Sequence, residues 1–271
     1  MNSTLFVLID LPYVPMSVFL VLWSAARWFL YPEDRKRSEW MLVVSALSAP
    51  AATLAERFAE TLSVIRPQKY DEFIFRIDSL LGQPSYAIGK FAAHHPSVTI
   101  LLSVVYGSLP IVMVWVFGIY LWRRQTDCVR VIYTFGLNLF AAIPLYLLFP
   151  VCGPRFAFKG FPFAQPNVDI PHTIAVSAAP NGIPSVHTST ALLAVFLLWP
   201  WRLQWVLAVI FLILTLLSTL GSGQHYFFDL VCALPYAILV YWAGAKIAHH
   251  TKDTSDDSSG RRKKEVATEG M

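Results

Sequence analysis

The sequence predicts an all-α integral membrane protein, a bundle of about seven helical spans (six to seven) with interfacial helices. Three observations predict this class. Of the 271 residues, 56% are hydrophobic and 14% are charged, whereas a soluble domain carries about 25% charged residues. Apolar runs recur at roughly the 17–25 residues that a helix needs to cross a bilayer. The chain also has 9 Trp, 11 Tyr and 19 Phe residues, which suit wide apolar faces and interfacial belts.

Seven apolar runs are candidate spans, and the second and fifth are the shortest. They cover residues 14–30, 40–55, 98–122, 131–149, 185–200, 203–220 and 227–248. The length of the second run leaves open whether it crosses the membrane completely. No basic residue precedes the first run, so MNSTLFVLIDLPY does not have the pattern of a cleaved signal peptide.

Charged and apolar residues alternate between the second and third runs, over residues 56–96. This pattern suits helices that lie in the membrane interface, and a folded extracellular loop fits it equally well. We therefore divide the chain into N-terminal spans with interfacial helices (1–96), a second helical bundle (97–250) and a cytoplasmic tail (251–271). The tail is polar and poor in aromatic residues, which predicts disorder.

Four basic clusters set the orientation, because positive residues flank spans on the cytoplasmic side. They are DRKR at 34–37, RR at 123–124, WR at 201–202 and RRKK at 261–264. With seven spans and the amino terminus outside, all four clusters and the carboxyl terminus are cytoplasmic. Residues 151–180, the start of the fifth run and the end of the sixth then face the periplasm of a bacterial inner membrane or the lumen of an endomembrane. The formal net charge of +4 is too small and too dispersed to predict a nucleic-acid partner.

His225 and Asp229 lie at the outer end of the last run. They are four residues apart, so on a helix they share one face. A carboxylate beside one ring nitrogen of a histidine fixes the tautomer and leaves the other nitrogen free to attack. A headgroup-level pair without chemistry is the alternative, although an aspartate within an apolar run is costly and usually functional.

His187 follows Pro184 and Ser185 at the start of the fifth run. Serine caps helix amides, proline is tolerated in the first turn, and a helix N-terminus offers N–H groups to an anion. Alone, PSVH fits an ordinary capped transmembrane helix better than a site. Two antiparallel helices joined by a short turn nevertheless bring His187 and His225 to one membrane surface. Within the fourth run, Asn138 is expected to hydrogen-bond between helices.

Together these segments resemble the type 2 phosphatidic acid phosphatase superfamily, whose pattern is K-x6-R-P, then P-S-G-H, then S-R-x5-H-x3-D. PSVH matches the second block with Val186 in place of glycine. STLGSGQHYFFD, residues 218–229, matches the third block in spacing, with Thr219 where arginine is expected. The first block is degraded, and its best counterpart is CGPRFAFK at residues 152–159. The resemblance covers residues 98 to about 248.

The resemblance implies phosphoryl transfer on a membrane phospholipid or lipid phosphate, with no metal and no other cofactor. His225 would be the nucleophile that forms a phosphohistidine, Asp229 would orient it, and His187 would be the acid that protonates the leaving alcohol. The side chains expected to bind the phosphate are Arg155, Lys159 and Ser185. The sequence offers none of the usual metal-ligand spacings, and it indicates no protein partner.

Thr219 points to one branch of the superfamily. Inositol phosphorylceramide and sphingomyelin synthases lack that arginine and carry an HYxxD block, similar to HYFFD at residues 225–229. In that branch a phospho-alcohol headgroup moves to a lipid alcohol acceptor, and the donor diester carries one negative charge. We therefore expect a lipid phosphotransferase. A lipid phosphate phosphatase and a non-catalytic membrane scaffold are the alternatives.

Overall fold

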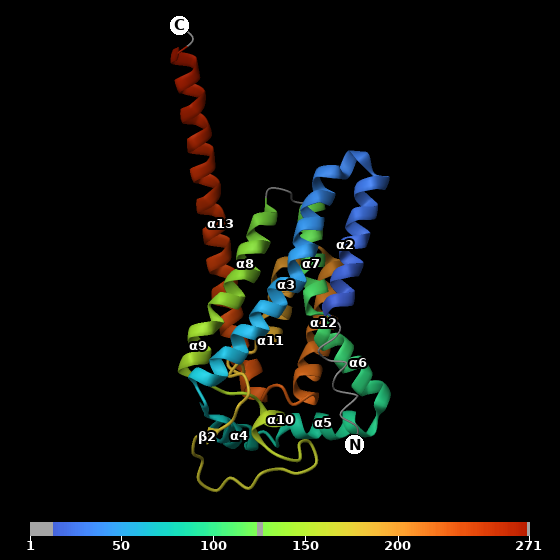
Figure 1. Cartoon of the computed structure of the whole chain (residues 1–271), viewed down its shortest axis with the longest axis vertical. Helices are drawn as coiled ribbons and strands as arrows, with labels where there is room; N and C mark the ends of the chain where they lie inside the picture. The colour runs from blue at the N-terminus through green and yellow to red at the C-terminus, as the bar shows by residue number, and fades with distance from the viewer. Residues whose placement is uncertain (1–12, 124–126, 270–271) are drawn as a thin grey trace.

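Helices make up 75% of the chain in the computed structural model, which describes residues 13–123 and 127–269 (Figure 1). The helices are α2 (Tyr13–Leu30), η1 (Pro32–Asp34), α3 (Arg35–Ile65), α4 (Asp71–Ser79), α5 (Pro84–His94), α6 (Pro96–Gly107), α7 (Leu109–Arg123), α8 (Cys128–Phe140), α9 (Ala142–Leu148), α10 (Pro154–Ala157), α11 (Val186–Leu198), α12 (Arg202–Gly221) and α13 (Phe227–Glu269). Two short strands, β1 (Gln68–Lys69) and β2 (Ile174–Ala175), pair antiparallel. The all-α prediction is therefore confirmed.

Three helical segments of the described chain are long and apolar enough to cross a membrane: Cys128–Leu148, Arg202–Gly221 and Phe227–His250. The pair α6 and α7 also passes the test as one span, with a bend of 50° between the two helices. Pro110 explains this bend, because a proline one turn beyond Tyr106 cannot continue the preceding helix. α11 is a shorter apolar helix of 13 residues. These segments support a helical membrane protein, and the count of seven spans stays a prediction.

α3 differs from the prediction in its length. It contains the run 40–55 but continues to Ile65, ten residues into the stretch assigned to interfacial helices. Once a helix has formed, each added residue costs little compared with starting a new helix. The remainder of that stretch forms α4 and α5, which lie across one end of the bundle (Figure 1).

α13 runs from Phe227 to Glu269. The disorder that the sequence predicts for residues 251–271 stays a prediction. The division of the chain into three regions at residues 96 and 250 stays a prediction.

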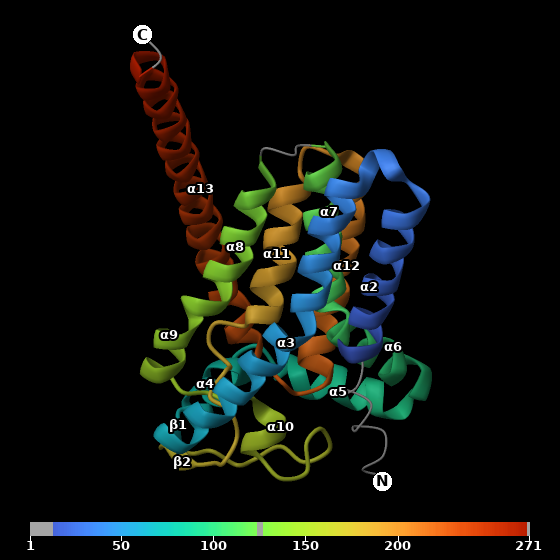
Figure 2. The same cartoon turned by 45° about the horizontal axis from the view of Figure 1, so that its top comes forward.

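The two ends of the bundle differ in what they carry. The starts of α11 and α13 lie at the end covered by α4, α5 and α10 (Figures 1 and 2). The α2–α3 turn, the end of α7 and the α11–α12 turn lie at the opposite end, with the basic clusters of residues 34–37 and 201–202. Cation–π contacts join the Arg27 guanidinium to the Trp122 ring at 4.9 Å and that of Arg123 to the Trp201 ring at 5.9 Å.

α11 is enclosed by its neighbours and contacts α7, α8, α12 and α13. Its fully buried apolar side chains include Leu193, Ala194, Leu197 and Leu198. Asn138 on α8 accepts a hydrogen bond from Ser189 Oγ at 2.7 Å and donates one to Thr190 Oγ1 at 2.9 Å. This confirms the prediction that Asn138 hydrogen-bonds between helices, and it fixes α11 against α8.

Candidate active site

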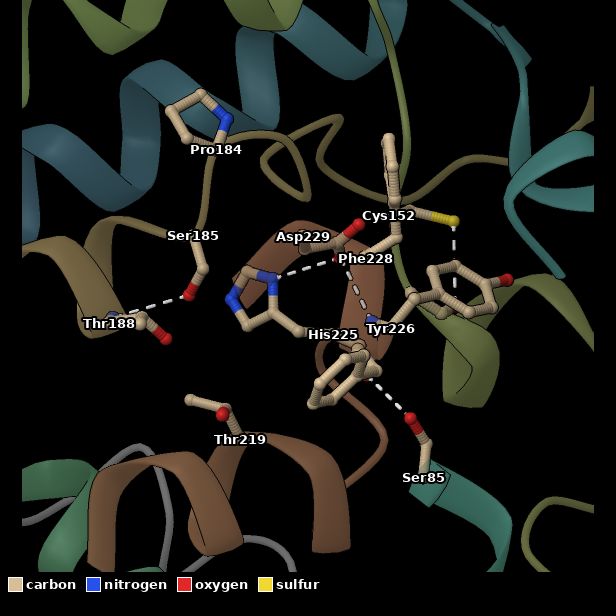
Figure 3. Close-up of polar contacts among 12 residues, drawn as sticks. Ser85, Cys152, Pro184, Ser185, Thr188, Thr219, His225, Tyr226, Phe228 and Asp229 are labelled. Carbon is tan, nitrogen blue, oxygen red and sulfur yellow. Dashed lines mark hydrogen bonds and ion pairs between the residues drawn. The ribbon is translucent and has the colours of Figure 1, made fainter. Parts of the chain in front are cut away.

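His225 lies on the short connection between α12 and α13, with its ring directed at Asp229 (Figure 3). Its Nδ1 is 3.3 Å from Asp229 Oδ2, and the same oxygen accepts a hydrogen bond from Tyr226 N at 2.9 Å. Both side chains are buried, with 3% of His225 and 0% of Asp229 exposed. The pair spaced four residues apart therefore does come into contact, as the sequence predicts.

Burial also decides the charge of this imidazole. It lowers the pKa of His225 to about 4, because an imidazolium loses its hydration when it is enclosed by protein. The ring is therefore neutral at pH 7. A hydrogen bond to the Gly182 backbone partly opposes this shift. A neutral imidazole keeps a lone pair on the nitrogen that carries no proton.

His187 reaches the same place from the first turn of α11. Ser185 is the N-cap of this helix, and its Oγ accepts a hydrogen bond from Thr188 N at 3.3 Å, which confirms the predicted cap. The backbone N–H of Ser185 donates to the carbonyl oxygen of Asp229 at 3.4 Å, which ties the start of α11 to α13. The ring centroids of His187 and His225 are 6.4 Å apart.

Tyr106 covers one face of the His187 ring. The two rings are stacked, with centroids 3.9 Å apart and planes inclined by 20°. Tyr106 is the penultimate residue of α6, directly before the bend that separates α6 from α7. His187 Nε2 is buried and has no hydrogen-bond partner among the described residues. The acid candidate is therefore oriented by an aromatic ring, whereas the nucleophile candidate is oriented by a carboxylate.

Arg155 lies beside the His225 connection. Its backbone N–H donates to Gly223 O at 3.0 Å, and a side chain at Gly223 would collide with Arg155 Cβ and with the Phe161 ring. Gly153 has φ +93°, and a Cβ there would collide with Gln224 O. The loop that carries the degraded first block is thus pressed against the loop that carries the nucleophile candidate, and only glycine allows this approach.

The other two predicted phosphate-binding residues differ in their exposure to solvent. Ser185 is buried at the start of α11, whereas Lys159 is exposed in the turn after α10. Thr219, which stands where the superfamily has arginine, is buried, and its hydroxyl donates to Thr215 O at 3.0 Å. Figure 3 shows Ser185, Thr188 and Thr219 on the side of the His225 ring that faces away from Asp229. That side is lined by hydroxyls.

Three polar residues of α4 and α5 contact the His225 connection or the first turn of α13, and sequence reasoning missed them. They are Asp71, Asp78 and Ser85, and all three are buried. The signal that was present is the spacing of seven between the two aspartates, which places them on one face of a helix two turns apart. Burial raises the pKa of both carboxyl groups to about 6. Within the described residues, no group of three or more His, Cys, Asp or Glu could hold a metal ion.

The two blocks thus meet in space, with one imidazole beside a carboxylate and a second at a capped helix start. The family model of the PAP2 superfamily matches residues 72–243. The chain belongs to the PAP2 superfamily. No curated protein and no solved structure matches it. The PAP2 match begins within α4, well before residue 98, so α4 and α5 belong to the part of the chain that the family shares. Membership supports an enzyme with phosphatase or phosphotransferase activity on lipid phosphates.

Proposed function

We propose that this PAP2 protein transfers a phospho-alcohol headgroup from a glycerophospholipid to a lipid alcohol through a phosphohistidine. The observation that carries the proposal is the set of His225, Asp229 and His187, with a contact of 3.3 Å between the first two and 6.4 Å between the imidazole centroids. A neutral, oriented imidazole is a nucleophile, and a second imidazole within reach is an acid and base.

The reaction has two displacements at phosphorus. In the first, the free ring nitrogen of His225 forms a P–N bond and the diacylglycerol oxygen leaves, taking a proton from His187. In the second, the acceptor hydroxyl gives its proton to His187 and attacks phosphorus, and the P–N bond breaks. Asp229 holds the ring and stabilises the positive charge that develops on it in each step. Every atom of the donor ends in diacylglycerol or in the new lipid.

The charge at the site favours a diester over a monoester. A phosphate monoester carries about −1.5 to −2 at pH 7, whereas a phosphodiester carries one negative charge. Thr219 supplies a hydroxyl where the superfamily pattern has an arginine, so one planar, bidentate cation is missing. Arg155, the amides at the start of α11 and the hydroxyl of Ser185 are the groups we assign to phosphate binding. This set is suited to one negative charge.

The decisive experiment follows two labels on one donor. Purified protein is incubated with a phospholipid that carries one label on the headgroup and another on phosphorus, with and without ceramide or diacylglycerol as acceptor. We expect both labels to move together into a new lipid, and only when an acceptor is present. His225→Ala should abolish this transfer, and turnover equal to the wild type in that variant would end the proposal.

A lipid phosphate phosphatase is the second candidate, and membership of the PAP2 superfamily favours it. It predicts that the phosphorus label appears in water as inorganic phosphate and that the acceptor has no effect. The degraded first block favours a non-catalytic scaffold instead. That reading predicts no movement of either label, and identical behaviour of the wild type and the histidine variants.

We further propose that the site faces the non-cytoplasmic side. The support is that the basic clusters of residues 34–37 and 201–202 lie at the end of the bundle opposite the histidines (Figure 1), and basic residues concentrate on the cytoplasmic side. The cation–π pairs of Arg27 and Arg123 at that end suit the headgroup region, where tryptophan rings concentrate.

A further inference from the structure

We propose that Asp71, Asp78 and Ser85 form a clamp that holds the backbone around His225 in the position that phosphoryl transfer needs. We call these three residues the α4–α5 clamp. As an assignment of positioning residues the proposal rests on the proposed function, whereas the contacts of the clamp stand by themselves. The hydrogen bonds of the clamp go to the chain segment that carries the reacting ring, so each member would act through that segment.

Asp78 caps α13 from a distance. Its Oδ2 accepts a hydrogen bond from Phe227 N at 2.7 Å, and its Oδ1 accepts one from Phe228 N at 3.0 Å, across 149 and 150 residues of sequence. The first amides of a helix have no partner within the helix and are normally satisfied by a nearby Ser, Thr, Asp or Asn. Before Phe227 the chain reads Gln-His-Tyr, so α13 has no cap of this kind of its own. The carboxylate also suits the positive end of the helix dipole.

Ser85 and Asp71 bind His225 and Tyr226, the two residues that precede α13. Ser85 Oγ donates to His225 O at 3.0 Å, and Tyr226 OH donates to Asp71 Oδ1 at 3.0 Å. Of the four consecutive residues from His225 to Phe228, three are therefore held at the backbone by α4 or α5, and Tyr226 is held at its side-chain hydroxyl. With its backbone held, the His225 side chain can change only its own rotamer. The contact between His225 Nδ1 and Asp229 Oδ2 restricts that rotamer.

Asp71 also connects the clamp to the loop that carries Arg155. Its carboxylate accepts hydrogen bonds from Cys152 N at 3.1 Å and from Gly153 N at 2.9 Å. The same side chain therefore sets the distance between the nucleophile connection and the phosphate-binding loop. In phosphoryl transfer most of the catalytic effect comes from positioning and charge, so a fixed distance between these two loops matters for rate.

The cost of the clamp is a reason to assign it a role in function. Two buried carboxylates near a third, Asp229, are expensive, because burial removes their hydration and like charges repel. Apolar packing would join α4 to α13 at lower cost. A carboxylate adds what apolar contact lacks, a directional bond to each of two neighbouring amides.

The test compares two acids on one helix. Asp78→Ala and Asp78→Asn are measured against Glu72→Gln, because Glu72 is also buried on α4 but binds His172 N at 2.9 Å in the outer loop. The first readout is hydrogen exchange of the peptide that spans residues 222–232. The second is kcat and KM for headgroup transfer by the full-length protein.

We expect Asp78→Ala to speed exchange at Phe227 and Phe228 by about 10–100-fold, which corresponds to the loss of hydrogen bonds to a charged group. It should lower kcat by about 10–100-fold and change KM by less than about 3-fold, because substrate-binding groups are untouched. Asp78→Asn should recover part of both, since its amide oxygen still accepts a bond. Glu72→Gln should change neither readout by more than about 2-fold.

Three outcomes overturn the proposal. Exchange at residues 225–228 that is unchanged in Asp78→Ala refutes the clamp itself. Faster exchange with an unchanged kcat refutes its role in positioning. If Asp78→Ala does not fold, the isosteric Asp78→Asn decides, and wild-type kcat and exchange in that variant overturn the proposal. If the wild type transfers no headgroup and releases no phosphate, the proposed function fails, and the exchange measurement alone decides the clamp.

Discussion

His187 and His225 face one another across 6.4 Å between their ring centroids, but their supports differ in kind. His187 stands in the first turn of α11, a helix whose cap, Ser185, comes two residues earlier in the sequence. His225 stands on a connection that is held by residues of α4 and α5 about 140–155 positions earlier. The cap of α11 is local in sequence, and longer-range contacts are added to it by Asp229 and by the Tyr106 ring. The connection depends on the whole fold, so it is the side of the site that distant substitutions should disturb.

The largest expected effect separates the two histidines by role. In the proposed mechanism His225 forms the P–N bond, so His225→Ala should lower the transfer rate by more than about 10⁴-fold. His187 is the proposed acid, so His187→Ala should lower the rate by about 10²–10⁴-fold. A donor with a leaving group more acidic than diacylglycerol, such as a nitrophenyl ester, needs less protonation and should rescue His187→Ala but not His225→Ala. Initial rates with both donors give the measurement.

The control for that prediction is His172→Ala. His172 pairs with Glu72 at 2.8 Å in the loop between α10 and α11, and its side chain is 72% exposed. Its loss should leave the initial rates with both donors within about 2-fold of those of the wild type. Rescue of both histidine variants by the activated donor, or of neither, would contradict the assignment of nucleophile and acid.

A smaller effect is expected at the ring that covers His187. Tyr106→Leu removes an aromatic stack worth about 0.5–1.5 kcal/mol, so kcat should fall by about 2–12-fold. Tyr106→Phe keeps the ring and should stay close to the wild type. The matched control is Phe91→Leu, because Phe91 lies against His95 with a centroid distance of 4.3 Å, away from the histidine pair. Equal rates in Tyr106→Leu and the wild type would show that the stack does not position the acid.

The same contrast explains what the sequence could predict. The start of α11 was predicted because Pro184, Ser185 and His187 are adjacent, and because a cap acts within one turn. The approach of His187 to His225 followed from two antiparallel helices and a short turn. The helix partner of Asn138 was predicted in kind but not in identity, since an amide within an apolar run needs some partner.

What remained hidden depends on contacts far apart in sequence. Residues 56–96 have an amphipathic pattern, and such a pattern shows that a helix has two faces without showing what covers each face. Asp71 and Asp78 are removed from solvent, Asp71 beside Tyr226 of the α12–α13 connection and Asp78 against the first residues of α13. No spacing within α4 indicates a partner 149 residues away. The bend after Gly107 was missed because the run 98–122 is uniformly apolar, although Pro110 marks the position.

The smallest effect that we predict concerns stability in mild acid, where His225 and the two aspartates of the clamp act with opposite sign. The pKa of His225 is lowered by burial from 6.5 to about 4, so between these values the unfolded chain binds a proton that the folded chain does not, and stability is lost as the pH falls. Burial raises the pKa of Asp71 and Asp78 from 3.8 to about 6, and Asp229 raises it further. As the pH falls, these carboxyl groups bind protons at a higher pH in the folded chain than in the unfolded chain. Stability is therefore gained as the pH falls from about 6 to about 4.

Single substitutions separate these opposing contributions. Asp78→Asn removes the stability that protonation of Asp78 adds and keeps the stability loss caused by His225. Its Tm should therefore fall more steeply than that of the wild type between pH 6 and pH 4. His225→Gln removes the stability loss caused by His225, so its Tm should fall less steeply. Thermal unfolding in one detergent at pH 7, 6, 5 and 4 gives the four-point slopes. Parallel slopes for the three proteins would mean that neither group changes its proton occupancy on unfolding in this window, and that the carboxylates of the clamp are less enclosed than their contacts indicate.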